Sequence, residues 1–262
     1  MDPRKAGAPR NRAAPVGCQN VTAMPLVTDV KDSARYLQQL AIRLAIDPAA
    51  VLRSARKVGH ELAMERRLGI RTAHRGFSPP GSRLGDASPS QPLRYEALEE
   101  VERDIVRRGL RLDSFVDLGC GRGRALAVLS KLPWSEMVGV EVDPAMAELA
   151  RANVRALPDG WKQARRIEVV EQDAADWGVD SASAVVLLFN PFGEPTLRTV
   201  LTRLTEGLLA SGRTEGRVDL YYAAPVHHRV VLEVFPGADA SALPCEDPGV
   251  YHYGLTALAG VR

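Results

Sequence analysis

The sequence predicts a doubly wound α/β fold, in which a mostly parallel sheet carries helices on both faces, preceded by an N-terminal helical module. Phe115 and Val116 indicate a short buried strand that breaks into a glycine-rich turn, and the helical stretch 125–132 follows at once. The unbroken apolar run 184–189 is typical of a central parallel strand that is buried on both faces. Strand-like and helical segments then alternate along the chain, which is the order that a doubly wound sheet requires.

The elements of the sheet domain can be placed by periodicity and by turn residues. Helical spacing is read from apolar residues three and four positions apart, and strands are read from short apolar or alternating runs. We expect strands at 115–116, 137–141, 167–170, 184–189, 218–224 and 250–258, the last of them antiparallel, and helices at 94–106, 125–132, 145–156, 196–209 and 225–234.

The N-terminal part of the chain shows helical patterns and no strands. Residues 32–46 carry Leu and Ala at helical spacing, and Asp47-Pro48 then gives an N-cap followed by proline at the first helical position. The second helix presents Val51, Leu52, Ala55, Val58 and Leu62 on one face, with Gly69 as its stop. We expect four regions: a disordered tail at 1–30, a helical module at 31–75, a linker loop at 76–92 and the sheet domain at 93–262.

Three glycines and two acids define the candidate ligand site. Gly119, Gly121 and Gly123 lack the Cβ that would keep backbone N–H groups away from a ligand, and a helix N-terminus follows them. Asp117 projects from the carboxyl end of its strand, where it repels a pyrophosphate and attracts an ammonium or sulfonium group. Glu141 ends the next strand, where an acidic side chain accepts both ribose hydroxyls. This pair fits a cationic, ribose-bearing cofactor without phosphates, which is S-adenosyl-L-methionine.

A nicotinamide cofactor is the competing interpretation of a glycine-rich turn. The dinucleotide fingerprint places a third glycine three positions after the second, and Arg124 stands there instead. Asp117 also opposes a pyrophosphate. A nicotinamide-dependent oxidoreductase is therefore the less favoured alternative.

Four short motifs in order along the chain resemble those of the class I S-adenosylmethionine-dependent methyltransferases, whose sheet is Rossmann-like. The resemblance extends over residues 93–262 and is most specific over 115–192. It implies that Asp173 accepts from the adenine amino group and that the Ala174 N–H reaches a ring nitrogen. The motifs are 115–123, 138–143, 172–174 and 190–192.

Residues for the transfer step are expected after the fourth and fifth strands. Asn190-Pro191-Phe192 resembles the N-P-P-F/Y element of amino-methylating members, although it has only one proline, so Asn190 is a candidate for cofactor or acceptor contact. His227 follows the fifth strand and is a candidate base, whereas we expect His228 on a solvated face. Cys120 is expected as a small filler between glycines, and no metal-ligand cluster is visible.

The charge and the apolar content of the chain limit which kinds of partner it can bind. Residues 1–92 hold 15 Lys and Arg against 7 acids, or +8, whereas residues 93–262 hold 19 against 25, or −6, which argues against nucleic acid on the sheet domain. No apolar run reaches the ~20 residues of a membrane helix. The first thirty residues lack a secretory signal, and the 3 cysteines imply neither disulfides nor zinc. We therefore expect a cytoplasmic protein, with a possible homodimer formed through the N-terminal helices.

The sequence thus predicts an S-adenosylmethionine-dependent methyltransferase that acts on a small-molecule acceptor. Two alternatives keep the same cofactor. The protein can be a lysine methyltransferase that modifies other proteins, an interpretation that rests on fold-level analogy, or a module that binds S-adenosylmethionine without catalysis.

Overall fold

The computed structural model describes six stretches of the chain. The chain divides into two compact units, Met1–Ser54 and Ala55–Arg262, and the first is described only from Asp47 onward. The expected tail at 1–30 and the expected helix at 32–46 lie outside the described residues, as does most of the expected linker loop. The described stretches are 47–73, 86, 91–178, 183–210, 216–246 and 248–256.

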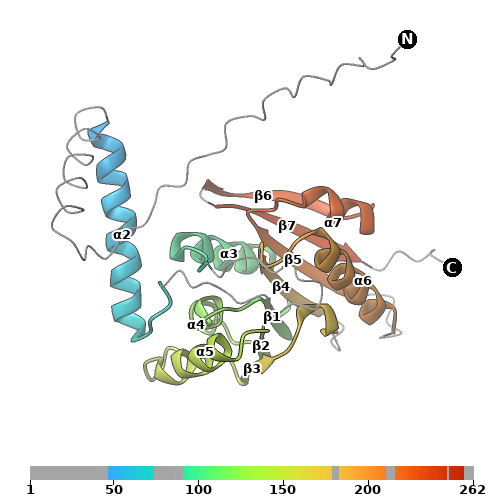
Figure 1. Ribbon diagram of the computed structural model, residues 1–262, viewed down its shortest axis with the longest axis horizontal. Coiled ribbons are helices and arrows are strands. Elements are labelled where there is room, and N and C mark those ends of the chain that lie inside the picture. Colours follow the sequence, from blue (N-terminus) through green and yellow to red (C-terminus); the bar gives the residue numbers. More distant parts are fainter. Residues whose placement is uncertain are drawn as a thin grey trace, which may run out of the picture. The chain divides into compact units, whose positions relative to one another are not determined.

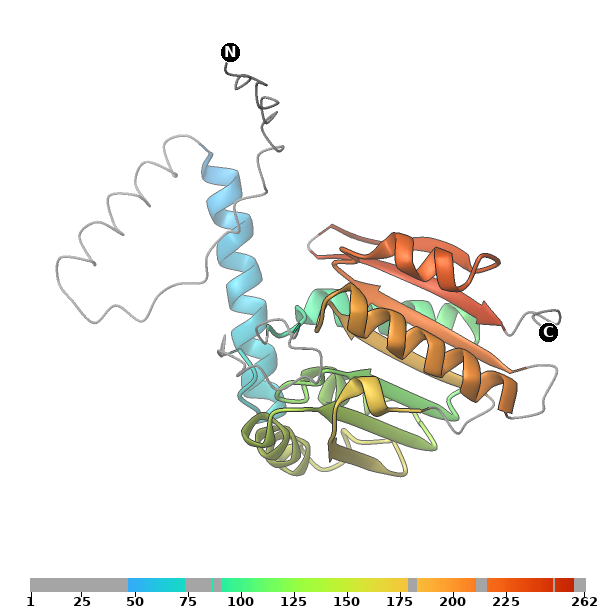
Figure 2. The ribbon, with the colours of Figure 1, turned by 45° about the vertical axis from the view of Figure 1, so that its right-hand side comes forward.

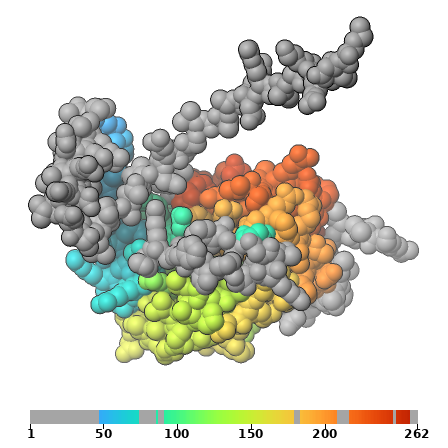
Figure 3. Space-filling model, viewed as in Figure 1, coloured from blue at the N-terminus to red at the C-terminus, as the bar shows by residue number. Residues whose placement is uncertain are grey.

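A seven-stranded sheet forms the centre of the second unit (Figure 1). Its order is β3-β2-β1-β4-β5-β7-β6. The first five strands of the chain pair in parallel, whereas β7 pairs antiparallel with β5, which confirms the late antiparallel strand. In Figure 3 the halves of the sheet domain appear as green-to-yellow and orange-to-red surfaces. The strands are β1 (Ser114–Leu118), β2 (Glu136–Glu141), β3 (Ile167–Glu171), β4 (Ser183–Phe189), β5 (Arg217–Ala223), β6 (Asp239–Glu246) and β7 (Gly249–Thr256).

Helices cover both faces of this sheet, as a doubly wound fold requires (Figures 1 and 2). One face packs against α3 (Tyr95–Arg108), α4 (Arg124–Leu129) and α5 (Pro144–Ala156). The other face packs against α6 (Glu194–Ala210) and α7 (His228–Val234). Alternate residues of the strands enter the two apolar cores, which confirms the predicted fold class.

Strand β6 was not predicted. Its sequence carries Pro244, and its pairing with β7 shifts register between Ala242 and Glu246. It lies at the edge of the sheet, where a missing N–H donor and a bulge are tolerated. An edge strand of this kind lacks the continuous apolar pattern from which the other strands were identified.

Helix α2 (Pro48–Leu68) begins and ends where its terminal residues predict. The Asp47 carboxylate accepts the Ala50 N–H at 2.7 Å, as an N-cap does. Gly69 follows the last turn with a φ of +68°, a left-handed conformation that glycine adopts without strain.

The apolar face that the sequence predicts for α2 is largely exposed in this chain, and what packs against it stays a prediction. The exposed fractions of Leu52, Val58 and Leu62 are 54, 41 and 50%. Met64 and Leu68 are buried instead, in the core beneath α3 and α4. The helix turns this face inward because Glu61 and Glu65, which lie near Met64 and Leu68, form ion pairs with the buried Arg124.

Candidate functional site

The glycine-rich loop that follows β1 contains three glycines with a left-handed backbone conformation. The φ angles of Gly119, Gly121 and Gly123 are +79°, +52° and +76°. The Gly119 and Cys120 N–H groups both donate to the Val140 carbonyl, at 2.9 and 3.0 Å, so the loop folds over the end of β2. Glycine is required because a Cβ in this conformation meets the following carbonyl oxygen.

Close contacts add a second requirement for glycine. A Cβ placed on Gly119 lies 2.6 Å from Pro191 Cβ, and one placed on Gly123 lies 3.1 Å from Ala150 Cβ on α5. The loop therefore packs against the segment that follows β4 as well as against α5. The predicted ligand loop and the predicted Asn190 segment lie side by side at the carboxyl edge of the sheet.

Asp117 and Glu141 are both buried at this edge, with 6 and 7% of their surfaces exposed. Burial, together with the nearby charge of Glu141, raises the pKa of Asp117 to about 7. In the part of the chain that the structure describes, no hydrogen bond reaches the Asp117 carboxyl group. A buried carboxylate in this situation favours either a proton or a cationic ligand.

Glu141 has a different environment from Asp117. Its Oε2 accepts the Gly121 N–H at 2.8 Å and its Oε1 accepts the Asp143 N–H at 3.0 Å. Burial raises the pKa of Glu141, and these two donors oppose the rise. Each carboxylate oxygen has a second lone pair, so Glu141 still has acceptor capacity while it anchors the loop.

Asp173 and Ala174 follow β3 at the same edge. The Asp173 carboxylate accepts the Ala175 N–H at 2.9 Å and caps the 3₁₀ turn η1 (Ala174–Asp176), while Ala174 is buried. Their expected contacts with adenine stay a prediction.

Asn190 ends β4 in an unusual backbone conformation. Its φ is +43°, which is uncommon outside glycine and is found preferentially at functional positions. The Tyr222 hydroxyl on β5 donates to Asn190 Oδ1 at 3.3 Å, so a buried tyrosine orients this amide. Phe192 is 6% exposed and belongs to the core between the sheet, α6 and α7.

Residues 115–212, which include both acids, the glycine loop and Asn190, match the family model of a methyltransferase domain. The chain contains a methyltransferase domain. The predicted resemblance to class I S-adenosylmethionine-dependent methyltransferases is confirmed over this segment.

Individual proteins resemble the chain more distantly. It is 30% identical over 160 residues to the carboxy-S-adenosyl-L-methionine synthase of Klebsiella pneumoniae (strain 342), an alignment that covers 52% of this chain and 61% of that protein. The corresponding protein of Salmonella paratyphi C (strain RKS4594) is 32% identical with the same coverage. The chain thus spans about three fifths of the length of these curated relatives.

A solved structure that resembles part of the chain is that of magnesium protoporphyrin IX methyltransferase from Synechocystis PCC 6803 with bound SAM. Its TM-score is 0.45 at 15% identity, and the match covers 62% of this chain and 78% of that one.

The two histidines after β5 lie at the same edge of the methyltransferase domain, at the start of α7. His227 is the half-buried N-cap of α7, and its role as a base stays a prediction. The expectation that His228 lies on a solvated face is wrong. Its Nδ1 lies 2.6 Å from the Tyr253 hydroxyl, and its ring packs against Tyr251 and Tyr253. Antiparallel pairing places β7 beside the end of β5, a contact that local sequence does not reveal.

Cys120 fits the methyltransferase domain as the expected filler residue. Its Sγ occupies the space beside Gly139 on β2, where an added Cβ lies 2.8 Å from the sulfur. Burial, the largest cause, raises the pKa of this thiol well above its ordinary value. The thiolate that a nucleophile requires is therefore disfavoured.

Asp86 is a residue of this edge that the sequence did not reveal. Its carboxylate accepts the Thr196 hydroxyl at 2.6 Å and the Thr196 N–H at 3.2 Å, which satisfies donors at the start of α6. Its backbone carbonyl accepts the Gly193 N–H at 3.0 Å. Asp86 therefore fixes the segment after Asn190 from 110 residues away in the sequence, and no local pattern marks it.

The described ranges lack two kinds of feature. They contain no group of three or more His, Cys, Asp or Glu side chains placed to hold a metal ion. Within the same ranges, every helix is too short or too polar to cross a membrane.

Proposed function

We propose that this protein is an S-adenosylmethionine-dependent methyltransferase that acts on a small-molecule acceptor. The observation that carries the proposal is Asp117, a buried carboxyl group without a hydrogen-bond partner among the described residues, beside the buried Glu141. Two acids at the carboxyl edge of a doubly wound sheet suit a ligand that brings both positive charge and hydroxyl groups.

Each part of that ligand has a candidate partner at this edge of the sheet. Asp117 pairs with the ammonium group of the methionine portion, and Glu141 accepts the two ribose hydroxyls. Asp173 and the Ala174 N–H hold the adenine. The left-handed glycines let the loop backbone approach the ligand closely.

Methyl transfer needs alignment more than it needs proton chemistry. When bound, S-adenosylmethionine would supply a sulfonium methyl group for in-line transfer to the acceptor, with S-adenosylhomocysteine as the leaving group. Asn190, oriented by Tyr222, holds the acceptor against the methyl group, and His227 removes a proton where the nucleophile requires it. The buried neighbours Pro191 and Phe192 limit the positions that the Asn190 amide can take.

A second candidate follows from the names of the relatives. Proteins 30 and 32% identical to this chain are carboxy-S-adenosyl-L-methionine synthases, so the site is a candidate for that carboxylated cofactor. The additional carboxylate of carboxy-S-adenosyl-L-methionine needs a positively charged partner in the site. Arg122 lies in the glycine loop, and within the described residues its buried Nε has no hydrogen-bond partner.

The function is tested with labelled cofactor. The protein is incubated with methyl-labelled S-adenosylmethionine, a panel of small molecules and a protein extract, and the label is traced in each fraction. Label in the small-molecule fraction supports the proposal, and label on lysine supports the protein-directed alternative. Binding without transfer indicates a non-catalytic module, and tighter binding of the carboxylated cofactor favours the second candidate.

Glu141→Ala should weaken binding of S-adenosylhomocysteine more than tenfold in calorimetry, because charge-assisted bonds to two hydroxyls are lost. Since Glu141 also anchors Gly121, the ribose contact is isolated with an analogue that lacks both hydroxyls. The wild type should bind this analogue more weakly than S-adenosylhomocysteine, whereas Glu141→Ala should bind both molecules with the same affinity. Glu136→Ala, at the opposite end of β2, is the control and should bind normally. An equal loss from the analogue in both proteins excludes the ribose contact.

Asn190→Ala should lower the turnover number at saturating cofactor more than tenfold and leave cofactor affinity nearly unchanged, because the loss falls on alignment of the acceptor. Tyr222→Phe keeps the ring and removes only the hydroxyl that orients Asn190, so a several-fold loss is expected. Turnover is measured with the acceptor that the labelling experiment identifies. Wild-type turnover in Asn190→Ala, or a loss confined to cofactor affinity, contradicts the acceptor role.

A further inference from the structure

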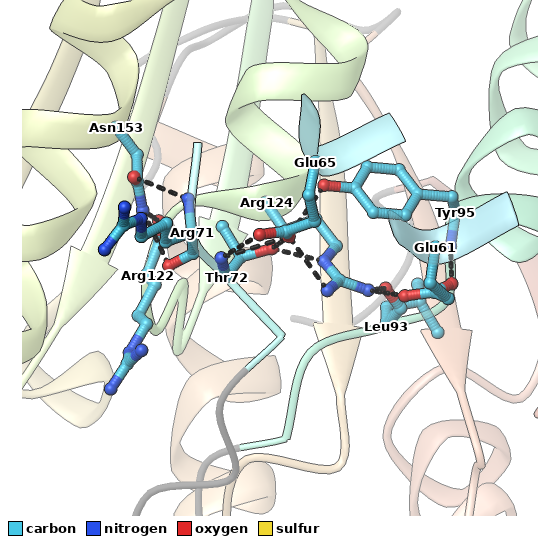
Figure 4. A network of polar contacts seen from close by, with 9 residues as sticks. All are labelled: Glu61, Glu65, Arg71, Thr72, Leu93, Tyr95, Arg122, Arg124 and Asn153. Atoms are coloured by element: carbon cyan, nitrogen blue, oxygen red, sulfur yellow. Dashed lines mark hydrogen bonds and ion pairs between the residues drawn. The ribbon is translucent and has the colours of Figure 1, made fainter. Parts of the chain in front are cut away.

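Arg124, the residue immediately after the glycine loop, is buried in a polar cluster (Figure 4). Only 4% of its side chain is exposed, although arginine is almost never buried without partners. Its Nε donates to Thr72 Oγ1 at 2.5 Å, and its terminal nitrogens donate to Glu61 at 2.5 Å and to Glu65 at 3.2 Å. The Leu93 carbonyl accepts a further bond at 3.1 Å.

The two glutamates come from one face of α2 and bind several elements at once. Glu61 accepts the Tyr95 N–H at 3.0 Å and so caps the start of α3. Glu65 accepts the Tyr95 hydroxyl at 3.0 Å and the Thr72 N–H at 2.8 Å. The Arg124 guanidinium also lies over the Tyr95 ring, 4.3 Å from its centroid. The cluster joins α2, residues 70–72, the start of α3 and the glycine loop.

The segment after α2 also holds the loop one residue before Gly123. Asn153 Nδ2 on α5 donates to the Arg122 carbonyl at 2.9 Å, and Asn153 Oδ1 accepts the Arg71 N–H at 3.1 Å. Arg71 and Thr72 are thus bonded, directly or through Asn153, to residues on both sides of Gly123. In Figure 4 the Arg122 side chain points away from the cluster around Arg124.

We propose that Glu61, Glu65 and residues 71–72 form part of the cofactor site without touching the ligand: they position the glycine loop through Arg124 and through Asn153. The proposal rests on the proposed function of that loop. Gly123 has access to many conformations, so the fixed residues on either side determine which N–H groups face the ligand. Arg124 is therefore a positioning residue, and its loss should weaken cofactor binding.

A purely structural role for Arg124 is the alternative, because removal of one partner of a buried ion pair destabilises a fold. The chain offers a matched control in Arg108 on α3, whose Nε bonds the buried Asp104 at 2.7 Å in a cluster that does not include the loop. Arg124→Met removes an arginine from the half-buried Glu61 and Glu65, and Arg108→Met removes one of the two arginines that bind the buried Asp104. Only the first releases the glycine loop.

The test measures binding of S-adenosylhomocysteine by calorimetry, at a temperature where circular dichroism shows each variant to be folded. Arg124→Met should bind at least tenfold more weakly than the wild type, and Arg108→Met should bind within twofold of it. Arg124→Lys keeps the charge without the forked geometry and should restore only part of the affinity. In turnover assays the KM for the cofactor should rise in Arg124→Met while kcat stays within twofold. Wild-type affinity in Arg124→Met overturns the proposal.

Two further measurements cover the remaining outcomes. If Arg124→Met does not fold, Thr72→Val and Asn153→Ala each remove one support and should weaken binding at least threefold; normal binding in both overturns the proposal. Hydrogen exchange at Gly121 and Gly123 in the ligand-free protein should accelerate in Arg124→Met and not in Arg108→Met. Because this readout needs no cofactor, slow exchange in both variants refutes loop positioning. Failure of the wild type to bind any adenosyl ligand instead refutes the proposed function.

Discussion

Binding of S-adenosylmethionine should tighten about tenfold between pH 5.5 and 7, because Asp117 must lose its proton to pair with the ammonium group. Burial and the charge of Glu141 raise the pKa of Asp117 to about 7, so the free protein holds this proton over most of that range. The window ends below the pKa of an α-amino group, about 8, so the ligand stays charged. Calorimetry across the range measures the change, and buffers of different ionisation enthalpy count the released proton.

Asp117→Asn keeps the shape of the side chain and removes its charge. We expect binding more than tenfold weaker at pH 7 and most of the pH dependence lost. Asp113→Asn, just before the amino end of the same strand, is the control and should behave as the wild type. The same pH dependence in Asp117→Asn as in the wild type shows that another group titrates.

The same carboxyl group should make the free protein less stable as the pH rises. Its folded pKa, about 7, lies above the unfolded value of 3.8, so the folded protein binds more protons between these limits. The free energy of unfolding therefore falls as the pH increases through this window and is lowest above it. Asp117→Asn removes this cost, and we expect the ligand-free variant to be more stable at pH 7 by on the order of 3 kcal/mol. Urea unfolding at pH 5 and pH 7 tests the sign.

Gly119→Ala should lower the free energy of unfolding by about 3 to 4 kcal/mol, more than alanine at the other glycines of the cofactor loop. About 1 to 2 kcal/mol comes from the left-handed backbone and the rest from overpacking against Pro191, 2.6 Å from the new Cβ. Gly160→Ala is a matched control, because the φ of Gly160 is +78° against +79° for Gly119 and no atom lies within 4 Å of its added Cβ. Gly160→Ala should lower the free energy of unfolding only by the contribution of the left-handed backbone. Urea unfolding compares the variants, and equal losses contradict the packing contribution.

The core of the fold and the centre of the site were predictable because their determinants are local. A strand that breaks into three spaced glycines adopts its turn wherever it stands, and an acid at the end of a parallel strand must face the carboxyl edge. Asp117 and Glu141 were assigned to one edge for this reason, and both are buried there. The apolar run of β4 likewise allowed few positions other than the middle of the sheet.

Contacts between distant segments decided the rest. The sequence shows Arg124 only as a missing glycine, whereas the fold buries it among Glu61, Glu65 and Thr72, which lie more than fifty residues earlier. The apolar periodicity of α2 does not mark the face that packs on the core, because the ion pairs of Glu61 and Glu65 with Arg124 determine which side of the helix turns inward.

By itself, then, the sequence determined a doubly wound domain and the pair of acids at its ligand edge, since periodicity, glycine spacing and strand ends are properties of neighbouring residues. Only the tertiary structure decided how the glycine loop is held, that Asp86 caps α6, and that His228 pairs with Tyr253. The physical reason is that a polar side chain taken out of water must find a partner, and that partner is determined by which elements pack together.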